Sequence, residues 1–231
     1  MKTCIHQPDF FPWLGLFNKI AKTDNFIVLD NVQTPGGKSW LTRNRLLYNG
    51  EVKWLTIPVY KKKIAIRDLE VSFKLNFQRK HLGFIRSSYG KAPFFKMIYP
   101  LFEEIYSKEC TNLCDFNLNA IKLINKKIGI MTNISFASDY VGSDFPPLLS
   151  GNDLVLEIVK KSNTKYYLSG TGCKDFINPK SFEDEGIKFE FQDFACKPYN
   201  QIGSKGNFVA QLSIIDVLFN LGYEGVYKIL K

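Results

Sequence analysis

The chain has 231 residues, of which 45% are hydrophobic and 15% aromatic, and it carries a formal net charge of +9. These totals predict a single folded domain over residues 1–231 and exclude a disordered protein. They also exclude a membrane span, which needs roughly 18 consecutive apolar residues, and no signal peptide is visible, so we expect a cytoplasmic protein.

The first thirty residues predict a strand, a loop, a helix and a second strand. A short strand over residues 2–5 leads into the loop "HQPDFFPW", and residues 14–22 have apolar side chains at helical spacing. The continuous apolar run of residues 25–30 is typical of a buried parallel strand. This order indicates a βαβ unit and an α/β fold, with a mixed, mainly parallel sheet and flanking helices.

The middle of the chain predicts an inserted hairpin followed by helices. Residues 52–59 and 64–73 have strand character, and the lysine-rich residues 60–63 would form the tip between them. From residue 76 onward, apolar residues three and four apart favour a helical segment, with Gly129 as its C-cap.

The last third of the chain returns to alternating strands and helices. Residues 132–138 predict a strand, and residues 153–163 a helix capped by Ser150 or Asn152. Two more strands are expected at 165–172, ending in a glycine turn, and at 187–194. A final helix over residues 212–230 should be broken at Gly222.

The positive charge suits either nucleic acid or a phosphorylated small molecule. The lysines are spread along the chain and no known nucleic-acid-binding motif is present, so we expect no nucleic acid partner. The cysteines are odd in number and scattered without zinc-ligand spacing, which predicts free thiols and no metal site: Cys4, Cys110, Cys114, Cys173 and Cys196. Nothing in the sequence identifies a cofactor.

One of only two histidines, His6, stands where the first strand opens into a loop. Ligands of open α/β sheets bind beyond the carboxyl ends of the strands, and a histidine there can contact a phosphate or act as a general base. Asp30 ends the next strand on the same rim and could orient the imidazole. The structural alternatives are a backbone hydrogen bond for His6 and an Asx turn with Asn31 for Asp30.

Two other stretches carry anion-binding residue types. Arg43 and Arg45 lie on one face if their segment is extended, which suits a phosphate or carboxylate, although paired arginines can equally be solvated. The glycine turn after residue 168 exposes N–H groups that could bind an anion, but it lacks the lysine of a P-loop. His81 belongs to a predicted helix, where a structural role is the alternative.

Taken together, these stretches resemble the WbqC-like protein family. The resemblance rests on "HQPDFFPWLGLFNKIAKTDNFIVLDNVQ", "SWLTRNRL", "KWLTIPV" and "HLGFIRSSYGKAPFF". It continues through "YYLSG", "FEDEGIKFEFQDF", "PYNQ" and "LSIIDVLFNLG", in matching order from end to end. The family is found with genes for O-antigen and other surface polysaccharides, which implies work on an activated sugar or its acyl donor.

The resemblance and the residue types together give a candidate site that we expect to converge on one pocket. As catalytic candidates we take His6, Asp30 and His81. As substrate-binding candidates we take Gln7, Pro8, Trp13, Arg43, Asn44, Arg45, Tyr89, Ser169 and Gly170.

Two kinds of function fit this set. The first is a transferase that places an acyl or aminoacyl group on a nucleotide-linked amino sugar, with a histidine as base and arginines on the diphosphate. The second is a nucleotidyltransferase-like enzyme, whose fold the stretch "AKTDNFIVLD" also resembles, although only one histidine of that superfamily's paired motif is present. A non-catalytic binding protein of the same pathway is the third possibility.

Overall fold

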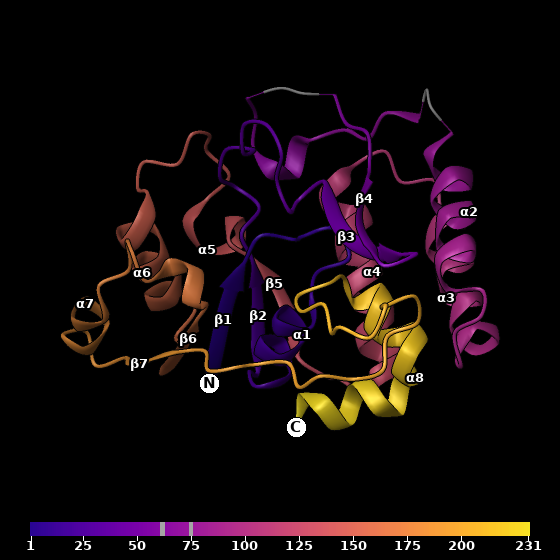
Figure 1. Cartoon of the computed structure of the whole chain (residues 1–231). Coiled ribbons are helices and arrows are strands. Elements are labelled where there is room, and N and C mark those ends of the chain that lie inside the picture. Colours follow the sequence, from indigo (N-terminus) through magenta and orange to yellow (C-terminus); the bar gives the residue numbers. More distant parts are fainter. Residues whose placement is uncertain (61–62, 74–75) are drawn as a thin grey trace.

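A computed structural model describes residues 1–60, 63–73 and 76–231 and shows an α/β fold around a five-stranded sheet (Figure 1). The strands are β1 (Lys2–His6), β2 (Asn25–Val28), β5 (Asn133–Phe136), β6 (Tyr166–Ser169) and β7 (Lys188–Phe191). They lie in the order β5-β2-β1-β6-β7, and each neighbouring pair is parallel. The predicted α/β class with a mainly parallel sheet is therefore confirmed.

Helices cover both faces of this sheet. Three short-to-medium helices, α5 (Ser138–Val141), α6 (Gly151–Lys161) and α7 (Pro179–Glu183), lie on one side (Figure 1). The other helices are α1 (Leu14–Ala21), α2 (Phe77–Tyr89), α3 (Phe95–Ser107), α4 (Leu113–Ile128) and α8 (Ile214–Leu230). Two 3-10 turns, η1 (Ile66–Asp68) and η3 (Thr171–Cys173), complete the elements described here.

The strands divide the interior into two cores because successive side chains point to opposite faces. Cys4 and Phe26 face the larger core with the long helices, whereas their neighbours Ile5 and Ile27 face the smaller core with α6 and α7. Both faces of the central strands are thus buried, which explains why their sequences read as unbroken apolar runs.

The hairpin prediction is confirmed only in part, because the two expected strands pair through an antiparallel bridge between Val59 and Val71 while the regular hairpin lies elsewhere. The antiparallel hairpin joins β3 (Arg43–Tyr48) to β4 (Glu51–Thr56), and its turn is Asn49-Gly50, both with positive φ. Asn-Gly is the preferred two-residue hairpin turn, so this signal was present in the sequence. Residues 64–73 hold η1 and isolated bridges instead of a strand, and Lys61 and Lys62 of the expected tip lie outside the described residues.

The helical predictions are confirmed for the middle and the end of the chain. Gly129 closes α4 in the left-handed conformation with φ of 76°. The last helix is broken at Gly222, whose φ of 66° a side chain would strain. A Cβ at Gly222 would also lie 2.7 Å from the Phe94 ring, so the break lets α3 and α8 pack closely.

The segment before α8 returns to the start of the chain. Ser213 Oγ donates to the Phe11 carbonyl at 2.7 Å, and Ser213 N donates to the Arg45 carbonyl at 3.0 Å. Three residues further on, the buried carboxylate of Asp216 accepts hydrogen bonds from the hydroxyls of Tyr89 and Tyr199. The loop after β7, the hairpin and the "HQPDFFPW" loop are therefore joined at one place.

Two further findings concern membrane spans and the cysteines. No helix in the described part of the chain is long and apolar enough to cross a bilayer. All five cysteines carry free thiols.

Candidate functional site

The sheet has its switch point between β1 and β6. β2 and β5 lie on one side of β1, and β6 and β7 lie on the other. Ligands of such sheets bind in the crevice beyond the carboxyl ends of the two central strands. A cavity of about 270 Å³, here called the rim cavity, occupies this place and is lined by His6, Asp9, Trp13, Gly15, Leu16, Lys19, Trp40, Asn44, Arg45, Gly170, Thr171, Gly172, Gln192 and Gln211.

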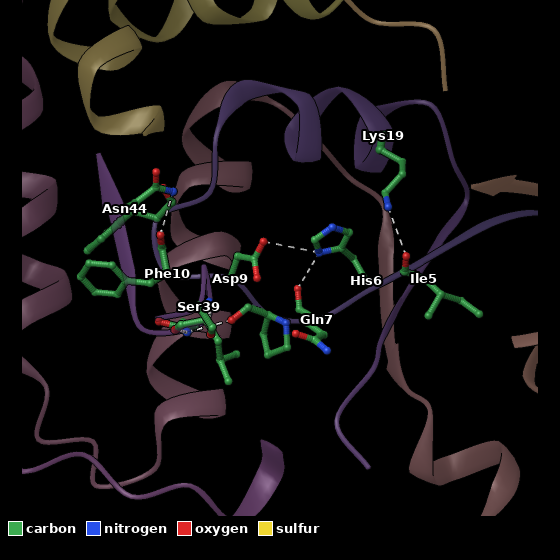
Figure 2. A network of polar contacts seen from close by, with 12 residues as sticks. Ile5, His6, Gln7, Asp9, Phe10, Lys19, Ser39 and Asn44 are labelled. Atoms are coloured by element: carbon green, nitrogen blue, oxygen red, sulfur yellow. Dashed lines mark hydrogen bonds and ion pairs between the residues drawn. The ribbon is translucent and has the colours of Figure 1, made fainter. Parts of the chain in front are cut away.

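His6 is the last residue of β1 and enters the rim cavity with a defined tautomer (Figure 2). Its Nδ1 lies 2.9 Å from the Gln7 carbonyl, which can only accept, so Nδ1 carries the proton and Nε2 is left as an acceptor. Burial of the ring and the nearby Lys19 lower the pKa of His6 to about 3. The ring is only partly shielded from solvent, because 36% of the side chain is exposed. With its pKa lowered, the ring is neutral at pH 7.

Asp9 lies beside His6, and its Oδ2 is 3.8 Å from His6 Nδ1 (Figure 2). The carboxyl is enclosed in the cavity wall, with 14% of the side chain exposed. Burial raises the pKa of Asp9 to about 7, and the positive charge of Lys19 limits the rise. A carboxyl with a pKa near neutrality is suited to accept and release a proton at physiological pH.

Lys19 is the most unusual residue of the cavity because it is almost fully buried, at 2% exposure. It lies on the inner face of α1, and its Nζ donates to the Ile5 carbonyl at 3.2 Å (Figure 2). Burial lowers the pKa of Lys19, while the neighbouring thiols and Asp9 favour its charge. An ammonium group held this way keeps donors available for an anion.

The loop between β1 and α1 is held in a strained form by polar side chains. Phe11 has φ of 38°, an uncommon backbone conformation for a bulky residue. The amide of Asn44 donates to the carbonyls of Phe10 and Phe11, and Ser213 Oγ adds a second donor to Phe11. This clamp fixes the position of Asp9, which precedes the strained residue by two positions.

Arg45 supplies the second cation of the rim cavity. It extends from β3, and its Nη2 donates to the Gln211 carbonyl at 3.0 Å. The guanidinium lies 5.5 Å from the centre of the Trp40 ring, while its Nε is buried without a partner among the described residues. Arg45 is therefore positioned by two contacts and retains an unused donor.

Glycines shape the remaining wall. Gly170 and Gly172 flank the start of η3, and a Cβ on Gly170 would lie 3.4 Å from Lys19 Nζ. Gly15 lies directly under the Trp13 indole, where a Cβ would be 2.0 Å from the ring. Backbone therefore approaches both the ammonium group and the aromatic wall closely, as glycine allows.

A larger cavity of about 810 Å³, here called the hairpin cavity, lies beside the hairpin. Arg43 contributes to it from β3, two residues before Arg45. The cavity is lined by Gln33, Thr34, Pro35, Gly36, Gly37, Lys38, Ser39, Leu41, Thr42, Arg43, Thr56, Ile57, Pro58, Val59, Lys63 and Leu69.

The structure brings together some of the sequence-predicted residues and separates others. Those that line the rim cavity are His6, Trp13, Asn44, Arg45 and Gly170. Gln7 and Pro8 follow His6 in the same loop and act through their carbonyls, which accept from His6 Nδ1 and from Asn117 respectively. Ser169 is fully buried at the end of β6.

His81 is not part of either cavity, contrary to the expected convergence. Its Nε2 donates to the Thr56 carbonyl at 3.0 Å, and its Nδ1 therefore accepts from the Tyr106 hydroxyl at 2.8 Å. The ring is surrounded by Phe10 and Phe77, and burial lowers its pKa to about 4. Both nitrogens are occupied, so His81 ties α2 and α3 to the hairpin.

Asp30 and Tyr89 are also interior residues that line neither cavity. Asp30 accepts from the backbone N–H and the hydroxyl of Ser138 at 3.0 and 2.7 Å, and so anchors the start of α5. Tyr89 is fully buried and joins the Leu47 N–H to Asp216. The expected convergence of His81, Asp30 and Tyr89 on one pocket is therefore not found, and their contacts are of a structural kind.

Sequence reasoning missed several cavity residues. Asp9 stands in the quoted "HQPDFFPW" loop, and Lys19 interrupts the apolar face of a predicted helix at a buried position. The signal at Lys19 was readable, since a lysine three residues after Leu16 falls on the same helix face. Trp40, Gln192 and Gln211 had no such signal, because their approach depends on tertiary folding.

No group of three or more histidine, cysteine, aspartate or glutamate side chains able to hold a metal ion occurs in the described ranges. The rim cavity instead offers cationic donors, Lys19 and Arg45, next to a titratable carboxyl, Asp9. This arrangement can bind an anionic group and move a proton beside it.

The fold and cavity define an α/β protein with a five-stranded parallel sheet and a polar cavity at its switch point. Within that class, the chain belongs to the WbqC-like protein family, whose model matches residues 7–228. The matched region contains Asp9, Lys19 and Arg45, and it begins one residue after His6.

One curated protein shows how far this similarity extends. The chain is 27% identical over 228 residues to the uncharacterized protein Rv1507c of Mycobacterium tuberculosis (strain ATCC 25618 / H37Rv), covering 96% of this chain and 95% of that protein. No solved structure matches the chain significantly.

Proposed function

We propose that the protein is a transferase that places an acyl or aminoacyl group on a nucleotide-linked amino sugar. The observation that carries this proposal is the cluster of Asp9, His6, Lys19 and Arg45 in one cavity at the switch point. A cytoplasmic role in bacterial surface polysaccharide (O-antigen) biosynthesis is part of the proposal and is supported by membership of the WbqC-like protein family.

Anion binding is the first task of this cluster. Lys19 Nζ and the Arg45 guanidinium face a cavity whose other wall is the glycine-rich start of η3. Guanidinium and ammonium groups with nearby backbone N–H groups match the diphosphate of a nucleotide-linked sugar. Trp40 and Trp13 supply flat apolar surfaces for a base or a sugar face.

Proton transfer is the second task, and Asp9 suits it better than His6. A base with a pKa of about 7 takes a proton from an ammonium more readily than one with a pKa of about 3. In the step, Asp9 takes a proton from the sugar ammonium, and the free amine nitrogen attacks the acyl carbon. The new C–N bond replaces the bond to the leaving group, which departs with its electron pair and is protonated by Asp9, while the second proton lost by the nitrogen goes to water. His6 positions the substrate through its free Nε2.

A thermal-shift series tests this proposal directly. At a ligand concentration of about 100 times Kd, a ligand that binds only the folded state adds about 2.7 kcal/mol, or roughly 5–10 °C in Tm for a chain of this size. We expect this shift with a nucleoside diphosphate amino sugar and not with a nucleoside triphosphate. Arg45→Ala should remove the shift, and the exposed Arg79→Ala should retain it as the matched control.

The other outcomes separate the alternatives. Stabilisation by the triphosphate alone would contradict acyl transfer and support a nucleotidyltransferase-like enzyme. Stabilisation by the sugar nucleotide without turnover, when activated acyl donors are supplied, would support a binding protein of the pathway.

A further inference from the structure

The hairpin cavity lies next to the rim cavity and shares the hairpin as a wall. Arg43 lines the hairpin cavity and Arg45 lines the rim cavity, and both belong to β3. Residues two apart on a strand lie on one face and are separated by about 7 Å. A ligand bound in one cavity can therefore extend an arm to the other over a short distance.

Unpaired positive charge surrounds the hairpin cavity. Lys38, Arg43 and Lys63 contribute to its lining, and no acidic residue does so in the part of the chain that the structure describes. Among the described residues, none of these three cations forms an ion pair with a carboxylate. The cavity therefore favours an anionic ligand.

Arg43 is also preorganised. Its guanidinium lies 3.8 Å from the centre of the Trp54 ring, and Trp54 packs on Trp40 with ring centres 5.4 Å apart. Both tryptophans are more than 40% exposed, so a flat ring of a ligand can reach them. A stacked guanidinium loses little freedom when it binds a phosphate.

The rest of the lining mixes apolar residues with uncharged polar ones such as Gln33 and Thr56. Leu41, Ile57, Val59 and Leu69 form much of the wall, together with Pro58. A volume of about 810 Å³ is within the range of sites that enclose a whole small ligand. Cations in a lining that is otherwise uncharged and partly apolar suit a ligand with phosphates at one end and a long, weakly polar arm.

We propose that the hairpin cavity is the donor subsite and binds a phosphorylated acyl thioester of the coenzyme A type. This inference rests on the proposed function, because it places the acyl donor opposite the amino sugar of the rim cavity. The amine nitrogen attacks the thioester carbon, the C–N bond forms and the C–S bond breaks. The sulfur leaves with the electron pair and is protonated to the thiol by Asp9, which carries a proton taken from the nitrogen, while the second proton lost by the nitrogen goes to water.

Calorimetric titration with coenzyme A itself tests the donor subsite. We expect binding to the wild-type protein and a loss of about tenfold or more in affinity for Arg43→Ala, which removes a charged hydrogen-bonding group. The double variant Lys38→Ala/Lys63→Ala should also bind coenzyme A more weakly than the wild-type protein. Lys53→Ala is the matched control, because Lys53 lies on the same hairpin, is exposed and pairs with Glu51 instead of facing the cavity.

A second titration, with the nucleotide-linked sugar, distinguishes the two proposals. Arg43→Ala should leave the affinity for the sugar nucleotide within about twofold of wild type. Arg45→Ala should weaken binding of the sugar nucleotide and leave the affinity for coenzyme A within about twofold. If coenzyme A binds through Arg43 but no sugar nucleotide binds, the proposed function fails while the subsite stands. If coenzyme A does not bind at about 1 mM, or binds Arg43→Ala as tightly as wild type, the subsite proposal is overturned. Arg43-dependent binding of a single-stranded oligonucleotide in place of coenzyme A would overturn it as well.

Discussion

The two histidines of this chain occupy opposite kinds of environment. His6 ends a strand at a cavity, with one ring nitrogen bound to a backbone carbonyl and the other free to meet a ligand. His81 lies in an aromatic interior, and both of its nitrogens have protein partners, Tyr106 and Thr56. Burial lowers the pKa of both side chains, yet only one retains a free acceptor.

The comparison shows that residue rarity and a shifted pKa do not by themselves identify a site. An unused hydrogen-bonding atom beside a cavity does so more reliably, because a satisfied buried group has no capacity left for substrate. Substitutions in the rim around His6 should therefore reduce activity, and substitutions in the interior around His81 should reduce stability. The predictions below test this division.

The largest effect should come from the carboxyl beside His6. Asp9→Asn removes the proposed base while keeping the size of the side chain, so kcat for acyl transfer should fall by about 10²–10⁴-fold. Tm should not decrease, because the variant removes a buried carboxyl whose ionisation burial disfavours. Steady-state kinetics and a melting curve check both parts, with the exposed Asp175→Asn as control. A kcat within threefold of wild type would exclude Asp9 as the base.

The histidine of the interior should show the opposite pattern. His81→Ala leaves the Thr56 carbonyl and the Tyr106 hydroxyl without a partner and opens a cavity among aromatic rings. We expect a loss of about 2–4 kcal/mol in the free energy of unfolding, measured by urea denaturation.

The matched variant for that experiment is His6→Ala. It should change Tm by no more than about 2 °C, because a partly exposed loop-end side chain contributes little to the core. Its turnover should nevertheless fall, though by less than that of Asp9→Asn. Equal destabilisation by both variants would break the division between rim and interior.

His81 should also make the free energy of unfolding depend on pH. The pKa of His81 is about 4 in the folded protein, below its ordinary value of 6.5, so below pH 6.5 the unfolded chain binds a proton that the folded chain does not. Stability contributed by His81 is thus present above pH 6.5 and falls as the pH drops towards 4. Between pH 7 and pH 5 the loss amounts to about 2 kcal/mol.

His81→Gln isolates this contribution. The other titrating groups remain in the variant. The lowered pKa of His6 acts in the same direction as that of His81, and the raised pKa of Asp9 acts in the opposite direction by weakening stability as the pH rises from about 4 to 7. Urea unfolding at both pH values should therefore give a shallower pH dependence for the variant. Parallel curves for the two proteins would show that His81 is not responsible.

The smallest effect concerns the glycine next to the buried lysine. Gly170 has φ of −74°, so alanine is tolerated by the backbone, but its Cβ would lie 3.4 Å from Lys19 Nζ. Gly170→Ala should shift the ammonium slightly and raise the KM for the sugar nucleotide by about twofold to threefold. Gly83→Ala, whose Cβ meets open space on α2 and which lines neither cavity, should leave KM unchanged. A similar rise in both variants would show that the effect is not specific to Lys19.

The fold was largely readable from the sequence because its strands and helices have strong periodic patterns. The apolar run at β2, the helical spacing of α4 and the break at Gly222 all reflect local chemistry that tertiary contacts did not override. The regular hairpin was misplaced because strand character does not specify the partner, and the decisive Asn49-Gly50 turn was not weighed.

The site was only partly readable, for a different reason. The position of His6 follows from strand order, and the placement of Arg43 and Arg45 follows from strand alternation. The contacts of His81 and Asp30 depend on Tyr106 and Ser138, which lie 25 and 108 residues away. Such pairings are set by packing of distant segments and leave no local trace.

The way Ser213 closes on Phe11 and Arg45 has a consequence for synthesis of the protein. All strands of the sheet are complete once residue 191 has been made, yet Gln192 and Gln211 of the rim cavity come later. A nascent chain on the ribosome can thus assemble its sheet while the cavity is still missing part of its wall. Activity should appear only when α8, which begins after Ser213, docks and brings Gln211 to the cavity wall.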